Sequence, residues 1–133
     1  MNQLPHKDRV FSIVDRIRSI RYAVEGFWLM LRTQHNAWVH LAATILVILL
    51  GLFLGLPTDA WLALILAIAA VWIAEALNTA FELLCDVAQP DFHPKVKAAK
   101  DVAAAAVLLS AIAAVAVGTI VFLPPIVRLI TSN

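Results

Sequence analysis

Long apolar stretches separated by short polar segments dominate the hydrophobic and polar pattern of this chain. A helix rises about 1.5 Å per residue, so about 20 apolar residues are needed to cross a bilayer. Stretches of this kind predict transmembrane helices over residues 37–56, 60–84 and 100–123. Pro124 and Pro125 follow the third stretch and are expected to end its helix, because proline has no backbone N–H to donate.

A helical period also runs through the polar segment that precedes the first apolar stretch. Apolar residues recur there at alternating steps of three and four, as on one face of an amphipathic helix. They are Val10, Ile13, Ile17, Ile20, Val24, Phe27 and Leu31. We therefore expect a surface helix over residues 8–32, lying in the headgroup region with its charged side toward anionic lipid. Two roles stay open for it, an anchor that orients the first span or a wall of a site at the membrane surface.

The composition agrees with a membrane protein and excludes several other classes. Hydrophobic residues make up 62% of the 133 residues and charged residues 14%, whereas a soluble domain carries about 25% charged residues. With a formal net charge of +1, the chain is neither a disordered tail nor a nucleic-acid binder with a basic face. Its single cysteine and four scattered glycines exclude an intramolecular disulfide and a glycine-rich phosphate loop. The sequence thus predicts one all-α integral membrane domain over residues 1–133.

Basic residues are distributed unevenly between the two ends of the predicted spans. Lysine and arginine gather before the first span and in the loop at residues 85–99 that precedes the third. The turn around Pro57 has none, and the C-terminal segment has only Arg128. Because cytoplasmic segments hold an excess of Lys and Arg, we expect the N-terminus and the loop in the cytoplasm. The turn and the C-terminus then lie on the outer side.

Four polar residues share one face of the second predicted span. At 100° per residue, Glu75, Asn78, Glu82 and Asp86 fall within about 80° of each other. Glu75 lies about 22 Å along the helix from Ala60, inside the hydrocarbon and near its cytoplasmic edge, and Glu82 lies about 10 Å further on. An ionisable residue within a span is a functional candidate by default. The structural alternative is a pair with a Lys or Arg of a neighbouring helix.

The third span opens with Lys97, Lys100 and Asp101, which adjacent antiparallel helices would bring level with the acidic face. The preference for basic residues in the cytoplasm could alone explain the lysines. Carboxylate and amide oxygens suit Mg²⁺, which proteins usually hold with one or two carboxylates plus substrate phosphates. A carboxylate in apolar surroundings is also suited to take a proton from a hydroxyl. We interpret His40 as an interhelical hydrogen-bonding residue, and the chain has no Cys and His spacing typical of zinc or haem.

Four motifs lie between residues 18 and 109, and the resemblance that they carry extends over nearly the whole chain. They are EALNTAFE from Glu75, HPKVKAAKDVAAAAVLL from His93, RSIRYAVEG from Arg18 and TQHNAWVHLAA from Thr33. Together they resemble the signature of the small prokaryotic diacylglycerol kinase and undecaprenol kinase family. The resemblance implies a homotrimer of three-span protomers with a surface helix, in the bacterial cytoplasmic (inner) membrane. It also implies that the chain phosphorylates a lipid hydroxyl directly from MgATP at the cytoplasmic face, with ATP, Mg²⁺ and a bilayer lipid as its ligands.

The resemblance assigns roles to four residues that would carry the chemistry. Glu75 matches the family's proposed general base, Asn78 the asparagine that organises the site, and Glu82 a metal-binding glutamate. Many members have a second metal-binding glutamate where this chain has Gln34. A glutamine oxygen can bind Mg²⁺ but supplies no negative charge. The resulting hypothesis is that Glu75 accepts the lipid hydroxyl proton while Mg²⁺ on Glu82 offsets charge on the transferring phosphoryl group.

Four further residues match positions that contact the nucleotide in this family. Lys100 and Asp101 match a Lys-Asp pair, with Lys100 near the γ-phosphate. Tyr22 and Asp86 match residues close to the nucleotide. The resemblance thus implies that the segment before the first span, the end of the second span and the start of the third all meet at one nucleotide site.

The resemblance leaves the lipid open between diacylglycerol and undecaprenol, because both carry a hydroxyl on an apolar body. The spacing of Asn36 and His40 and the stretch from His93 look closer to the undecaprenol kinase branch. Two other functions stay open. The departure at Gln34 favours a non-catalytic homologue that binds lipid or nucleotide, and a buried glutamate also occurs in small proton-coupled transporters. Transporter sites tend to lie near the bilayer midplane, which argues against that function because Glu75 lies well past it.

Overall fold

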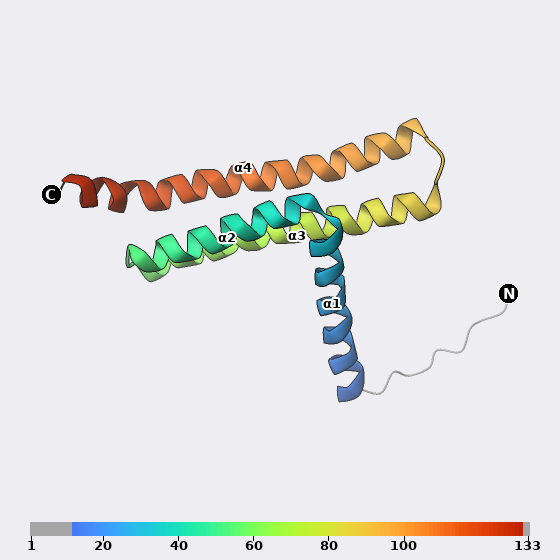
Figure 1. Cartoon of the computed structure of the whole chain (residues 1–133), viewed down its shortest axis with the longest axis horizontal. Coiled ribbons are helices and arrows are strands. Elements are labelled where there is room, and N and C mark those ends of the chain that lie inside the picture. Colours follow the sequence, from blue (N-terminus) through green and yellow to red (C-terminus); the bar gives the residue numbers. More distant parts are fainter. Residues whose placement is uncertain (1–11, 132–133) are drawn as a thin grey trace.

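The computed structural model describes residues 12–131, and all of the regular secondary structure in that range is helical. The four helices are α1 (Ile13–Thr33), α2 (His35–Phe53), α3 (Thr58–Ala88) and α4 (Pro94–Thr131). Figure 1 shows α2, α3 and α4 side by side, with α3 running antiparallel to both of the others. Helix α1 lies crosswise to this bundle (Figure 1). The all-α prediction is therefore confirmed.

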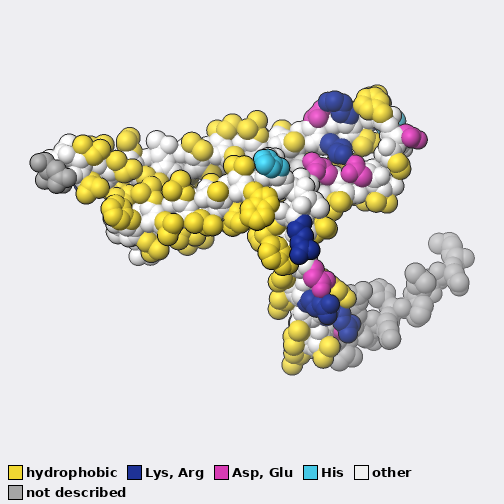
Figure 2. All heavy atoms as spheres, in the orientation of Figure 1, with side chains coloured by type: hydrophobic (Ala, Val, Ile, Leu, Met, Phe, Trp, Pro, Cys, Tyr) yellow, Lys and Arg dark blue, Asp and Glu magenta, His cyan; other side chains and the backbone are white. Residues whose placement is uncertain are grey.

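Three of these helices are long and apolar enough to cross a membrane. They are α2, α3 and α4, with mean hydropathies of 2.0, 2.2 and 2.6 over their most apolar windows. Large apolar side chains cover the outside of the bundle (Figure 2). A bilayer solvates such surfaces, and a helix satisfies its own backbone polar groups there. The helices have the features expected of an integral membrane protein, and the prediction of three helices long and apolar enough to span a membrane is confirmed.

The expected end of the last helix at Pro124 is wrong. Helix α4 continues through Pro124 and Pro125 to Thr131. A proline inside a helix removes one backbone hydrogen bond, but membrane helices tolerate it where side chains and local adjustments satisfy the freed carbonyl. Here Thr131 also contributes to the last turn, since its hydroxyl donates to the Val127 carbonyl at 2.9 Å. Proline therefore marks the end of the apolar stretch but not of the helix.

The loop expected at residues 85–99 is also much shorter than predicted. Helix α3 continues to Ala88 and α4 begins at Pro94, which leaves residues 89–93 as the connection. Proline is favoured in the first turn of a helix, where its missing N–H would have no intrahelical partner. The Lys95 backbone N–H donates to His93 Nδ1 at 3.3 Å and so caps this end. The short connection brings the end of α3 and the start of α4 close together.

The joint between α1 and α2 determines where the first two helices meet α3. Ser12 caps α1 by accepting from the Asp15 backbone N–H at 3.3 Å, and residues 8–11 of the predicted surface helix lie outside the described range. Gln34 alone connects α1 to α2, with an extended backbone (φ −106°, ψ 117°). A small core holds this elbow against α3 and consists of Met30, Leu31 and Ala37 with Leu41 and Trp72.

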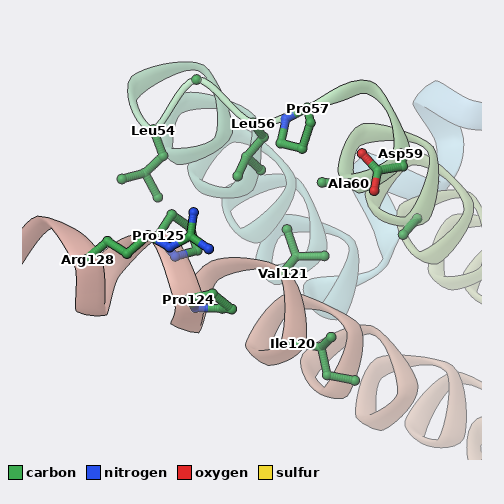
Figure 3. Close-up of a pocket in the computed structure, with 12 residues that line it drawn as sticks. Leu54, Leu56, Pro57, Asp59, Ala60, Ile120, Val121, Pro124, Pro125 and Arg128 are labelled. Carbon is green, nitrogen blue, oxygen red and sulfur yellow. The ribbon is translucent and has the colours of Figure 1, made fainter.

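The opposite end of the bundle carries the turn between α2 and α3. Gly55 has a φ of +61°, a left-handed conformation that glycine adopts without strain. A cavity of about 480 Å³ lies beside this turn, and Figure 3 shows Asp59 and Arg128 among its apolar lining residues. The acidic face of α3 lies toward the other end of the helix, so this cavity is separate from the predicted site.

Candidate active site

A polar cavity of about 260 Å³ lies between α2, α3 and α4. Asn78 and Glu82 line it from α3, and Gln34, Asn36 and His40 line it from the start of α2 and the residue before it. The residues of α4 that line it, from Ala104 to Ala111, are apolar. The cavity is therefore polar toward α2 and α3 and apolar toward α4.

Glu82 is held by two amide side chains. Gln34 Nε2 donates to its Oε2 at 3.1 Å, and Asn78 Nδ2 donates to its Oε1 at 3.0 Å. Hydrogen bonds to an ionised carboxylate are about twice as strong as those between neutral groups. The structure thus brings together three residues that the sequence predicted for the site, and it joins the elbow before α2 directly to α3.

Glu75 is the most deeply buried polar residue of the described range. It is 1% exposed, and neither of its carboxylate oxygens has a hydrogen-bond partner among residues 12–131. Its ion-pair partner in this range is His40, whose Nε2 lies 3.6 Å from Glu75 Oε2. The structural alternative of a pair with Lys or Arg is therefore not seen in the described chain. A buried carboxylate without hydrogen bonds is costly, so the site holds an acceptor with unused capacity.

The oxygen atoms of this region fit a hard cation only in part. Asn78 Oδ1 is buried and lacks a hydrogen-bond partner within residues 12–131, and it lies on the same side chain that supports Glu82. In the described part of the chain, no group of three or more His, Cys, Asp or Glu side chains could hold a metal ion. One carboxylate with amide oxygens suits an ion held mainly by substrate phosphates, as is usual for Mg²⁺.

Charged side chains gather where α3 ends and α4 begins (Figure 2). Lys100 Nζ lies 2.8 Å from Asp86 Oδ1 and links the two helices across the 89–93 connection. Lys97 Nζ lies 2.6 Å from Asp101 Oδ2 within α4, and both of these side chains are more than 60% exposed. The predicted proximity of the lysines to the acidic face of α3 is thus present for Lys100.

Tyr22 lies on α1, whereas the other predicted site residues lie at the elbow and on α3 and α4. It is 61% exposed on α1 and makes no hydrogen bond with the other predicted site residues in the described range. Beside it, Arg21 Nε donates to the Glu25 carboxylate at 2.7 Å, and this hydrogen bond raises the pKa of Arg21.

Sequence reasoning missed the position of His40 relative to Glu75. The sequence predicted an interhelical hydrogen bond for His40 but did not say with which residue. In the described structure the His40 Nε2 atom is buried and makes no hydrogen bond. The available signal was the antiparallel register. His40 follows Gln34 by six positions, and Glu75 precedes Glu82 by seven. Once Gln34 is known to face Glu82, this spacing places His40 and Glu75 at about the same level along the two helices.

Comparisons with known proteins agree on one family. A sequence profile described as prokaryotic diacylglycerol kinase matches residues 21–122. The chain is 36% identical over 107 residues to the undecaprenol kinase of Bacillus subtilis (strain 168), and the matched region covers 80% of this chain and 87% of that protein. It is 42% identical over 112 residues to the diacylglycerol kinase of a Synechocystis strain, which covers 84% of this chain and 64% of that protein. The residues matched by the profile include all those that line the polar cavity.

Proposed function

Since this chain belongs to the prokaryotic diacylglycerol kinase family and is a lipid kinase, we propose that it transfers the γ-phosphoryl group of MgATP to the hydroxyl of a membrane lipid. The transporter and the non-catalytic homologue are less well supported, because both similar proteins carry the name of a kinase. The observation that carries the proposal is the buried, unbonded Glu75 carboxylate beside a polar cavity. Glu75 does not itself line that cavity, but His40, which does, has its Nε2 3.6 Å from Glu75 Oε2.

In this proposal Glu75 is the general base for the lipid hydroxyl. The proton moves to a Glu75 oxygen as the hydroxyl oxygen forms its bond to the γ-phosphorus, and the bond from that phosphorus to the ADP oxygen breaks. An apolar cavity of about 330 Å³ supports this direction of approach. It shares Val39, His40 and Ala111 with the polar cavity and continues along α4 to Phe122. A lipid chain in this cavity would lie against His40, whose Nε2 is 3.6 Å from Glu75 Oε2, and we propose that its hydroxyl reaches Glu75 from there.

The polar side of the cavity is assigned to the phosphates. Glu82 would hold Mg²⁺ together with amide oxygens of Gln34 and Asn78, and Asn78 also keeps Glu82 in place. When bound, Mg²⁺ would supply positive charge against the transferring phosphoryl group. Gln34 and Asn78 contribute no charge of their own, so among the described residues that line the cavity Glu82 is the one carboxylate available to the ion.

The nucleotide is assigned to the charged region where α3 and α4 meet. Lys100 would contact the γ-phosphate, with Asp86 holding the ammonium group at 2.8 Å and Asp101 following it in α4. Catalysis would then consist of positioning plus electrostatic stabilisation. Tyr22 is assigned to the same nucleotide, and because it makes no hydrogen bond with the other site residues in the described range, we propose that a second copy of the chain completes the site.

The membrane setting of the proposal follows from charge and exposure. We assign the whole chain to one domain in the bacterial cytoplasmic (inner) membrane, with the N-terminus and the 89–93 connection in the cytoplasm. The surface role of α1 is supported by its exposed apolar residues Ile13, Ile17 and Ile20, which share the helix with Arg18 and Arg21. A homotrimer is part of the proposal, and the wide apolar surface of the bundle is compatible with contacts between copies.

The lipid is proposed to be diacylglycerol or undecaprenol, giving phosphatidic acid or undecaprenyl phosphate. One similar protein is named an undecaprenol kinase and the other a diacylglycerol kinase. A direct comparison with labelled ATP and each lipid, separated by thin-layer chromatography, identifies the substrate. Transfer to one lipid at a rate at least tenfold above the other would assign the activity.

The decisive experiment for the base is the E75Q variant, measured for phosphoryl transfer and for ATP binding in the same preparation. We expect a loss of transfer of at least about 100-fold, because removing a general base costs about 10²- to 10⁴-fold, with ATP binding retained. E25Q is the matched control, since Glu25 is an exposed carboxylate of α1, and it should transfer at the wild-type rate. Near wild-type transfer in E75Q would exclude Glu75 as the base.

A further inference from the structure

His40 and Glu75 face each other across the interface between α2 and α3. His40 Nε2 lies 3.6 Å from Glu75 Oε2, and the two side chains are 14% and 1% exposed. Both atoms lack a hydrogen-bond partner within residues 12–131. The pair therefore consists of a nitrogen and a carboxylate oxygen that are buried together, slightly beyond hydrogen-bond distance, and have no other polar partner in the described chain.

The imidazole ring is held in this position by an aromatic neighbour. The His40 and Trp72 rings meet edge to face, with centroids 6.4 Å apart and an interplanar angle of 72°. Trp72 is itself held by two contacts. Its Nε1 donates to Thr44 Oγ1 at 3.1 Å, and the ring of Phe27 in α1 packs against it with the ring centroids 5.2 Å apart. Residues of α1, α2 and α3 thus restrict the rotation of His40 and keep its Nε2 directed at Glu75.

Within residues 12–131, Glu75 has no Lys or Arg as an ion-pair partner. The next charged side chain on the same face of α3 is Glu82. Its two carboxylate oxygens accept hydrogen bonds from Gln34 and Asn78. The part of α4 that lines the cavity is apolar between Ala104 and Ala111. Among the described residues, His40 is thus the group that can orient the Glu75 carboxylate.

We propose that His40 is a positioning residue for Glu75, a role that rests on the proposed function of Glu75 as the base. In the reacting complex the Nε2–H of His40 donates to Glu75 Oε2 and leaves Oε1 for the lipid hydroxyl. Catalytic hydrogen bonds are often long before substrate binds and shorten in the complex, which accounts for the 3.6 Å separation. The proton of the hydroxyl goes to Oε1, and His40 gives up no proton and gains none.

The direction of Nε2 makes the proposal testable with two amide side chains. A glutamine at position 40 places its Nε2 about where histidine has Nε2. An asparagine has a shorter side chain and places its amide nitrogen near the position of histidine Nδ1, too far from Glu75 to donate to it. We expect H40N and H40L to lower kcat by about 30-fold, since misplacing a catalytic group costs about 10²-fold or less, with the KM for ATP within twofold. H40Q should recover kcat to within about fivefold of wild type. H35Q and H35L, at an exposed histidine of the same helix, should match wild type.

A double variant separates positioning from a general structural effect. If His40 acts through Glu75, H40N in an E75Q background should lower the residual rate no further, because residues that act as one unit are not additive. A further loss of 10-fold or more in the double variant, or kcat in H40N within twofold of wild type, would overturn the proposal. Should H40L fail to fold, the comparison of H40Q with H40N decides, and equal rates in these two would also overturn it. Retained transfer in E75Q alone would instead refute the proposed base.

Discussion

Replacing Gln34 by glutamate would put a second carboxylate beside Glu82. In the structure Gln34 Nε2 donates to Glu82 Oε2 at 3.1 Å, in a partly buried position between the elbow and α3. The Q34E variant exchanges this donor for an acceptor with a negative charge. Two effects therefore oppose each other, a repulsion in the metal-free protein and a stronger attraction for Mg²⁺.

The magnitude of the repulsion follows from the separation. Two unit charges at 3.1 Å repel by about 5 kcal/mol at an effective dielectric constant near 20, and rotation to a separation of about 6 Å leaves about 3 kcal/mol. Loss of the hydrogen bond to a charged group adds about 1.5–3 kcal/mol. A Mg²⁺ ion between the two carboxylates would turn this repulsion into attraction.

The assay measures both effects in purified Q34E. Without Mg²⁺ we expect the midpoint of thermal unfolding to fall by at least about 5 °C. With MgATP and lipid we expect the Mg²⁺ concentration at half-maximal rate to fall about tenfold, which corresponds to about 1.4 kcal/mol. H35E is the matched control, because it adds one negative charge at the next residue, whose side chain is exposed, and it should leave both quantities close to wild type.

The reasoning would be refuted by either of two results. An unchanged thermal midpoint without Mg²⁺ would mean that residue 34 does not face Glu82. A lowered midpoint with an unchanged Mg²⁺ requirement would mean that the two side chains meet but that the ion binds elsewhere. Q34A separates these outcomes further, since it removes the amide donor and adds no charge.

Two other predictions concern packing and the nucleotide. In G51A the new Cβ would lie 2.8 Å from the Trp61 ring, so thermal unfolding in detergent should show a loss of about 1–3 kcal/mol, and an unchanged midpoint would contradict the tight contact. In K100M transfer should fall at least about 100-fold, whereas D86N, which removes the partner of Lys100, should raise the KM for ATP only a few fold. Equal effects of K100M and D86N on kcat would argue against a direct contact of Lys100 with phosphate.

The sequence predicted the parts of the site that belong to one helix or to its immediate continuation. Glu75, Asn78 and Glu82 are separated by three and four positions, which places them on one face of any α-helix. Lys100 was expected near the end of α3 because a short connection brings neighbouring helix ends together, and it lies 2.8 Å from Asp86. The ends of the elements were predicted less well, because apolar character ended at Pro124 while the backbone hydrogen bonds of α4 did not.

By itself, then, the sequence determined four helices, three of them able to span a bilayer, and an acidic face on the second span, since each depends on a period within a single helix. Only the tertiary structure decided that Gln34 donates a hydrogen bond to Glu82 and that His40 faces Glu75. These pairs depend on the register between α2 and α3. That register is set by the one-residue elbow, by the packing of Trp72 against α1 and α2, and by the close approach of Gly51 to Trp61, none of which a helical period contains.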